Sequence, residues 1–174
     1  MHILNYYFTP FAVILIAFAV FFSEPERGTT FAAFALLAGS FGLNYWLSAN
    51  AYRLMQYTRH VRGLMVWLNL ATSAALFFLL APYWAPMWLL FLTAPAASGM
   101  FMRRWQVLGV ALASSAVMFA IYFYRSLEMA ADTGVVFSAQ LAGMVATQAV
   151  FIVFFSLFVA AMAETAVKVR DSLR

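Results

Sequence analysis

Six long apolar segments, separated by short stretches of charged or turn-forming residues, make up most of this 174-residue chain. A helix needs roughly 20 predominantly apolar residues to cross the hydrocarbon core of a bilayer. The pattern therefore predicts an all-α integral membrane protein with six transmembrane helices. We expect these helices at residues 3–22, 31–51, 64–81, 86–102, 107–124 and 135–163.

The basic residues orient the six predicted helices. Eight of the ten Lys and Arg residues fall in three clusters, and these lie on one side of the predicted bundle. The clusters are Arg53, Arg59 and Arg62, then Arg103 and Arg104, then Lys168, Arg170 and Arg174. Short cytoplasmic loops carry an excess of Lys and Arg. We therefore expect both termini of this multi-pass protein to be cytoplasmic.

The first apolar segment has a second interpretation. Ala17, Phe18 and Ala19 fit a small-residue cleavage site loosely, as in a secretory signal peptide. The residues before the segment carry no Lys or Arg, however, and such peptides begin with a positively charged region. We favour a retained helix; cleavage would leave five helices and an outside N terminus.

Composition excludes several classes of function. Soluble domains are about 45–50% apolar and about 25% charged, whereas this chain is 66% hydrophobic and 9% charged. The net charge of +4 lies mainly in short loops that can contact anionic lipid, so membrane lipid is an expected partner and nucleic acid is not. Without cysteine, the chain cannot form a disulfide, a thiolate nucleophile or a Cys-ligated iron–sulfur cluster.

No catalytic, metal or cofactor constellation is visible in the sequence. The central parts of the predicted helices carry no ionisable residue, although such residues mark ion pathways and proton relays in membranes. The only histidines, His2 and His60, lie near predicted membrane edges. We therefore expect a non-enzymatic protein with no catalytic residue, no metal and no cofactor.

Neutral polar residues recur on the faces of several predicted helices. They include Ser40, Asn44 and Ser48 in the second helix, Asn69 and Thr72 in the third, and Gln148 in the sixth. Polar side chains in hydrocarbon need partners, so these faces should point inward. One interpretation is hydrogen bonding between helices. The other is a binding site for a small polar or amphiphilic ligand, lined by Asn44, Asn69 and Gln148.

The turn between the third and fourth helices is rich in aromatic residues and proline. Tyr83, Trp84 and Trp88 match the preference of Tyr and Trp for the headgroup level, and we expect them to make contacts at the outer face. Pro86 opens the fourth helix and Pro95 interrupts it. Because proline removes a backbone hydrogen bond, the fourth helix should be kinked or broken.

The sixth helix is predicted to continue past the membrane. No Gly or Pro occurs at residues 164–174, so we expect a transmembrane bundle at 1–163 followed by a cytoplasmic helical extension at 164–174. Apolar residues alternate at spacings of three and four, as in a coiled coil, at Ile152, Phe155, Val159, Met162, Ala166, Val169 and Leu173. Ala166, Val169 and Leu173 would form the output seam. Alternatively, the extension is an amphipathic tail lying on the inner leaflet.

Several segments together resemble the N-terminal membrane region of bacterial sensor histidine kinases of the pilin-regulating type, a six-helix sensor module. The matching segments are Arg59-His60-Val61-Arg62, Met65-Val66-Trp67-Leu68-Asn69-Leu70, Pro82-Tyr83-Trp84-Ala85-Pro86, Arg103-Arg104, and Phe151-Ile152-Val153-Phe154-Phe155 continuing to Glu164 and Arg170. The resemblance spans about two-thirds of the chain. It implies a place in the bacterial cytoplasmic (inner) membrane.

The chain departs from that family in two ways. The family often has an acidic residue where this chain has Asn69, and the sequence contains no phosphoacceptor histidine or ATP-binding glycine motif. Only the sensing half of the family's function can therefore be carried over.

The sequence is compatible with three functions. The first is a non-enzymatic sensory or regulatory module that passes a signal through helix six to a cytoplasmic partner, or to a second copy in a homodimer. The second is a structural or assembly subunit of a larger membrane complex, packed against other protein subunits. The third is a binding component or facilitator for a small neutral or amphiphilic solute.

Overall fold

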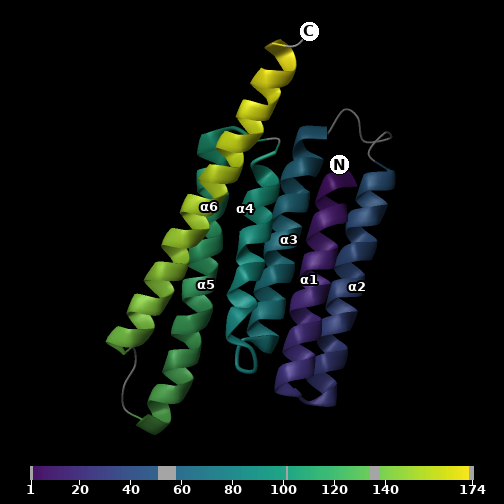
Figure 1. Ribbon diagram of the computed structural model, residues 1–174. Helices are drawn as coiled ribbons and strands as arrows, with labels where there is room; N and C mark the ends of the chain where they lie inside the picture. Colours follow the sequence, from purple (N-terminus) through teal and green to yellow (C-terminus); the bar gives the residue numbers. More distant parts are fainter. Residues whose placement is uncertain (1, 51–57, 101, 134–137, 173–174) are drawn as a thin grey trace. The chain divides into compact units, whose positions relative to one another are not determined.

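The computed structural model describes residues 2–50, 58–100, 102–133 and 138–172. Its helices are α1 (His2–Ser23), α2 (Arg27–Ala49), α3 (Thr58–Leu80), the 3-10 helix η2 (Ala85–Leu92), α4 (Thr93–Ser98), α5 (Arg104–Thr133) and α6 (Ala139–Ser172) (Figure 1). These described ranges contain no β-strand. The all-α prediction is confirmed, and each predicted apolar segment overlaps a helix, with η2 and α4 together taking the place of the fourth.

Four helices are long and apolar enough to cross a membrane, at Arg27–Leu47, Gly63–Leu80, Arg104–Glu128 and Ala139–Ser172. Two further apolar helical stretches, Pro10–Ser23 and Ala85–Ser98, are shorter. Large apolar side chains also cover the outside of these helices: Phe31 is 77% exposed and Phe154 is 72% exposed. A soluble protein rarely exposes such extensive apolar patches. Length, composition and surface are together those of a membrane protein.

Several helices are longer than the apolar pattern predicts. The predicted fifth helix ends at residue 124, but α5 continues to Thr133. The charges of Arg125 and Glu128 lower the hydropathy of this stretch without breaking a helix, and Gly or Pro is absent until Gly134. Likewise, α2 begins at Arg27 and α3 at Thr58, within predicted charged loops, because charged residues lower hydropathy without breaking a helix. Apolar length thus marks the membrane-compatible part of a helix and not its ends.

The fourth apolar segment is broken, as its prolines predict. It runs as a 3-10 helix through Leu92 and becomes α-helical at Thr93, two residues before Pro95. Pro95 cannot donate a backbone hydrogen bond. The carbonyl oxygen of Leu90 accepts hydrogen bonds from the hydroxyls of Ser73 and Thr93 and from the Thr93 backbone N–H. A 3-10 helix rises about 2.0 Å per residue instead of 1.5 Å, so the eight residues of η2 span about 16 Å.

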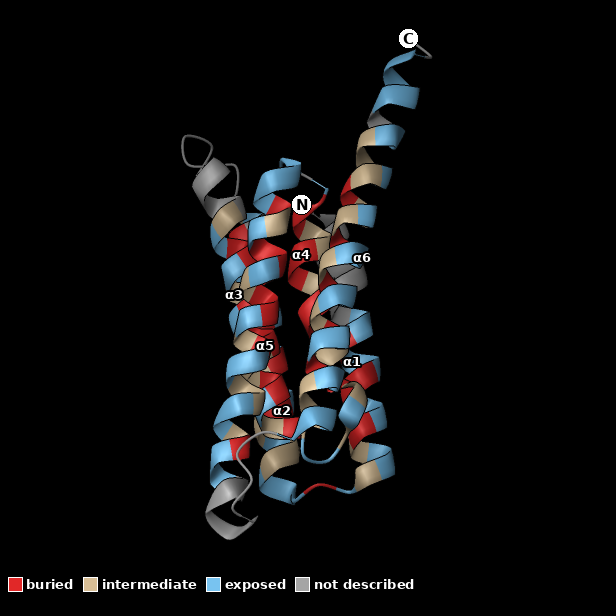
Figure 2. Cartoon of the chain, turned by 90° about the vertical axis from the view of Figure 1, so that its left-hand side faces the viewer, coloured by how far each residue is buried: buried red, intermediate tan, exposed pale blue. Residues whose placement is uncertain are grey.

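The chain divides into two compact units, residues 1–93 and residues 94–174. In the first unit, α1 packs on α2, α2 on α3, α3 on η2, and η2 on α1, which closes a ring of four helices. Figure 2 colours the buried positions red along these helices. The core of this unit includes Ile16 of α1 and the edge-to-face ring pair Phe77 and Phe91, whose centroids lie 5.2 Å apart.

The second unit is built on the packing of α5 against α6. Helix α6 begins at a Ser138 cap, whose hydroxyl oxygen accepts a hydrogen bond from the Leu141 backbone N–H at 3.2 Å. Its buried residues follow helical spacing at Val145, Gln148, Ile152, Ser156 and Ala160. Small side chains occupy the C-terminal part of this stripe, and they let the neighbouring backbone come close.

Candidate functional site

Two buried polar layers join α2 to α3. In the first, which we call the asparagine layer, Nδ2 of Asn44 donates a hydrogen bond to Oδ1 of Asn69 at 2.7 Å. In the second, the hydroxyl layer, Oγ1 of Thr72 lies 3.1 Å from Oγ of Ser40. Asn44 is 2% exposed and Asn69 is fully buried. The structure therefore brings together four of the six polar residues singled out in the sequence.

Both layers belong to a regular seam between two antiparallel helices. Buried residues of α2 recur at spacings of 4, 3, 4 and 3 at Ala33, Leu37, Ser40, Asn44 and Leu47. Those of α3 recur at spacings of 4, 3 and 4 at Met65, Asn69, Thr72 and Leu76. This is the alternation of coiled-coil core positions, where a buried asparagine fixes the register of the two helices. Leu47, Met65 and Leu68 form the apolar layer next to the asparagines.

The two other predicted polar residues do not join these layers. The side chain of Ser48 lies outside the described residues. Gln148 is buried in the unit formed by residues 94–174, where it forms a side-chain hydrogen bond with Tyr122 of α5. A ligand site lined jointly by Asn44, Asn69 and Gln148 therefore remains a prediction, and only the pair in α2 and α3 is in contact.

The aromatic turn before η2 packs against the turn between α1 and α2. The ring of Trp84 stacks on Phe22 with centroids 5.5 Å apart, and the Ser23 hydroxyl donates a hydrogen bond to the Tyr83 carbonyl oxygen at 2.7 Å. Tyr83 is exposed at its side chain, while Trp84 and Trp88 are half-buried. Part of the predicted outer-face set therefore holds two turns together, and its role in contacts with other molecules remains a prediction.

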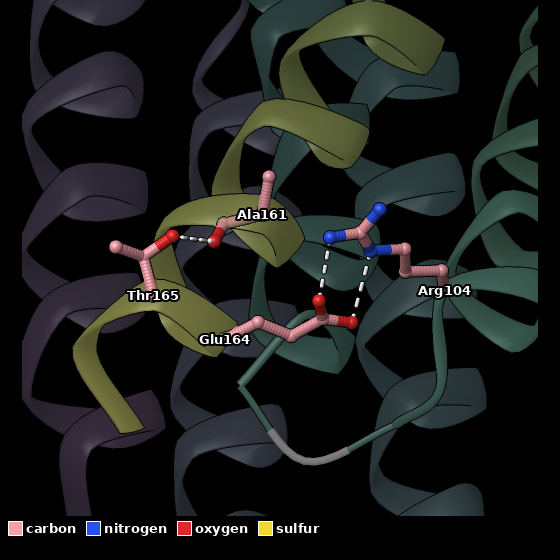
Figure 3. Close-up of polar contacts among 4 residues, drawn as sticks. All are labelled: Arg104, Ala161, Glu164 and Thr165. Carbon is pink, nitrogen blue, oxygen red and sulfur yellow. Dashed lines mark hydrogen bonds and ion pairs between the residues drawn. The ribbon is translucent and has the colours of Figure 1, made fainter. Parts of the chain in front are cut away.

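A contact that the sequence pattern did not predict holds α6 to the start of α5. Arg104 makes a two-pronged ion pair with Glu164, its Nε and Nη2 donating to the two carboxylate oxygens at 2.9 and 2.5 Å (Figure 3). One turn earlier on α6, the backbone passes close to Gly99: a Cβ there would lie 3.2 Å from the Ala160 nitrogen. We call Gly99, Arg104, Ala160 and Glu164 the α6 clamp.

Both charged members of the clamp are solvent-accessible, with side-chain exposures of 58% for Arg104 and 44% for Glu164. An exposed ion pair contributes little to folding stability. Its paired donors nevertheless fix geometry, because a guanidinium matches both oxygens of a carboxylate at once. The clamp therefore sets where α6 lies along α5, and sequence could not reveal it because its partners are 60 residues apart.

Beyond the clamp, α6 continues without a break to Ser172. Ala166 and Val169 of the predicted output seam are exposed, Val169 by 53%, and Leu173 lies outside the described residues. Further back in the same register, Ile152 is fully buried inside the unit. Among the described residues of this register, Phe155, Met162, Ala166 and Val169 are exposed.

Among the residues that the structure describes, no three His, Cys, Asp or Glu side chains gather closely enough to hold a metal ion. The features that could carry a function are thus the asparagine layer, the α6 clamp and the exposed seam. Comparison of the chain with protein-family models, with curated proteins and with solved structures finds no match.

Proposed function

We propose that this chain is a non-enzymatic sensory or regulatory module of the bacterial cytoplasmic membrane. It would cross the membrane six times, with both termini in the cytoplasm, and pass its signal through α6. The observation that carries this proposal is the length of α6. Its 34 residues span about 51 Å at 1.5 Å per residue, whereas the hydrocarbon core is about 30 Å thick.

The surroundings of the clamp support the proposal that α6 leaves the membrane near Glu164. Arg103, Arg104 and Lys168 are exposed near this end of the second unit, and Trp105 beside them is 83% exposed. Basic residues together with Trp are typical of a cytoplasmic membrane boundary. From Glu164 to Ser172 the helix extends about 12 Å further, far enough to reach a cytoplasmic partner.

The same clamp supports a route for the signal. It ties α6 to the turn after α4, and that turn follows the broken helix formed by η2 and α4. A shift in the broken helix would be passed to Ala160 through the close backbone contact and to Glu164 through the ion pair. Because α6 is one continuous helix, the exposed seam would move with them.

The proposed topology predicts which surface residues can be labelled from each side of the membrane. The natural chain has no cysteine, so any labelling by a thiol reagent comes from the single cysteine that is introduced. We expect Glu26→Cys to react with a membrane-impermeant maleimide in intact cells. Ser172→Cys should react only after the membrane is permeabilised; both residues are exposed. Labelling of both positions from the same side would contradict the six-crossing topology.

The proposed output predicts a parallel homodimer through the exposed seam. With mild oxidation in native membranes, we expect Ala166→Cys and Val169→Cys each to form a disulfide with a second copy. Lys168→Cys is the matched control, because it is also exposed but lies off the seam. A disulfide requires Cα atoms roughly 4.4–6.8 Å apart, so cross-linking reports direct apposition.

A second substitution tests whether the seam itself holds the copies together. Adding Val169→Glu to Ala166→Cys should lower the cross-linking yield at least about tenfold, because two carboxylates would face each other in the seam. An unchanged yield would overturn the proposed output. If no seam position cross-links and different proteins co-purify in fixed ratio in mild detergent, the assembly-subunit alternative would replace it.

A further inference from the structure

The asparagine layer contains two buried atoms that have no hydrogen-bond partner. Oδ1 of Asn44 and Nδ2 of Asn69 are both shielded from solvent, although the other atoms of the two amides are bonded to each other. The layer thus offers one free acceptor and one free donor group. Leaving a polar group unpaired in a membrane interior costs more free energy than one hydrogen bond between membrane helices contributes.

Neighbouring layers do not supply the missing partners. On one side, the Thr72 hydroxyl is engaged by Ser40 and by the carbonyl oxygen of Leu68. On the other side, Leu47 and Met65 are apolar and packed together. If the asparagine layer needed no further molecule, every polar atom of Asn44 and Asn69 would already have a hydrogen-bond partner.

The two free atoms define the chemistry of what they can bind. The partner must donate a hydrogen bond to Oδ1 of Asn44 and accept one from Nδ2 of Asn69. A carboxylate has no donor and an ammonium group has no acceptor. No Lys, Arg, Asp or Glu lies in α2 after Arg27 or in α3 after Arg62, so nothing on the seam would balance an ion. A hydroxyl group meets both needs with a single neutral atom.

We propose that the asparagine layer binds the hydroxyl group of a small neutral molecule, which bridges Asn44 and Asn69. Two sources share this chemistry, a hydroxylated amphiphile that enters from the bilayer and a water molecule held between the helices. The proposal goes beyond the output proposed for α6, since the layer lies within residues 1–93. It stands even if the α6 seam has no partner.

Asparagine-selective labelling can test the site directly. The chain has four asparagines, at positions 5, 44, 50 and 69, so ¹⁵N-Asn protein gives four pairs of side-chain amide signals. The protein should be studied in a phosphocholine detergent, because sugar detergents carry hydroxyls themselves. Asn50 is the internal reference, since its Nδ2 already donates to the Trp46 carbonyl oxygen.

The probe is 1,2-hexanediol, a neutral amphiphile with hydroxyl groups. Saturable shifts of the Asn44 and Asn69 signals, with Asn50 unmoved, would identify an amphiphile site. A persistent cross-peak between the Asn69 amide and water, without a diol response, would identify bound water as the hydroxyl source. The absence of both signals would overturn the proposal.

Substitution provides a second test that does not depend on NMR signals. In the double variant Asn44→Leu and Asn69→Leu, both the interhelical hydrogen bond and the free atoms are removed. The midpoint of thermal unfolding should rise with diol concentration in the natural protein and stay constant in this variant. Equal rises in both would show that the diol acts on the protein in general, and they would contradict an amphiphile at the asparagine layer.

Discussion

Gly99→Val is expected to destabilise the unit formed by residues 94–174 by about 3 kcal/mol, the upper end for forcing extra atoms into a packed interior. A Cβ at this position would lie 3.2 Å from the Ala160 nitrogen and 3.2 Å from the Ala96 carbonyl oxygen. Both are backbone atoms of helices, so no flexible side chain can turn away. Gly99→Ala should also destabilise this unit, by a smaller free energy.

The measurement is reversible unfolding in mixed micelles, followed by far-ultraviolet circular dichroism. Gly109→Val is the matched control: it lies on α5 of the same unit, and a Cβ there would meet nothing within 4 Å. Its unfolding free energy should change by less than about 1 kcal/mol, since only helix propensity is altered. Equal losses for the two valine variants would contradict the close approach of α6.

A rescue experiment separates the backbone contact from ordinary side-chain crowding. The closest atoms of Ala160 are its backbone nitrogen and its Cα, and the Cα lies 3.4 Å from the position that a Cβ at Gly99 would take. Adding Ala160→Gly to Gly99→Ala removes only the Cβ of Ala160. We therefore expect no recovery of stability, and recovery would place the contact at the alanine side chain.

Sequence alone predicted the all-α class and the membrane-compatible helices because both rest on apolar length, whereas the six crossings and the cytoplasmic termini stay predictions. It predicted the asparagine pair in part. Asn44 and Asn69 each recur with other polar residues on one helix face, so their inward placement follows from spacing alone. Their pairing depends on the alignment of α2 with α3, which one sequence does not encode locally. Gln148 has the same polarity and lies in the other unit, bonded to Tyr122.

The sequence pattern does not predict the α6 clamp, for a different physical reason. Gly99 and Ala160 have short or no side chains, and this allows two backbones to approach each other. An apolar pattern does not distinguish such positions from those of other small residues. In the sequence, Arg104 and Glu164 look like ordinary charged residues at a membrane edge, whether or not they are in contact. Only the tertiary arrangement shows that they face each other.

The aromatic turn illustrates the same difficulty. Tyr and Trp near a predicted membrane edge are expected at the headgroup level whether they face lipid or protein. The stacking of Trp84 on Phe22 reveals that this ring packs within the first unit. Residue type predicts a headgroup-level position for Trp84, which stays a prediction, and it does not predict the neighbour of this ring, which depends on how two turns 60 residues apart meet.

Reversing one charge of the clamp is expected to release the α6 extension, and reversing both is expected to restore it. Glu164→Arg would place a second guanidinium against Arg104, and the repulsion would replace a two-pronged ion pair. In the swap Arg104→Glu with Glu164→Arg, the same two groups face each other from opposite helices. Stability should change little in either variant, because the pair is exposed; the position of the extension should change.

Spin labels can measure that position, since the chain offers no competing cysteine. Labels at Leu112→Cys on α5 and Ser172→Cys on α6 are both at exposed sites away from the clamp. We expect a narrow distance distribution in the natural background, a distribution roughly twice as broad with Glu164→Arg, and a narrow one again in the swap, because only the swap restores opposite charges. High salt should broaden the natural distribution by screening the pair. If Glu164→Arg leaves the distribution narrow, the close contact at Gly99 alone holds α6, and the ion pair has no part in passing movement to the seam.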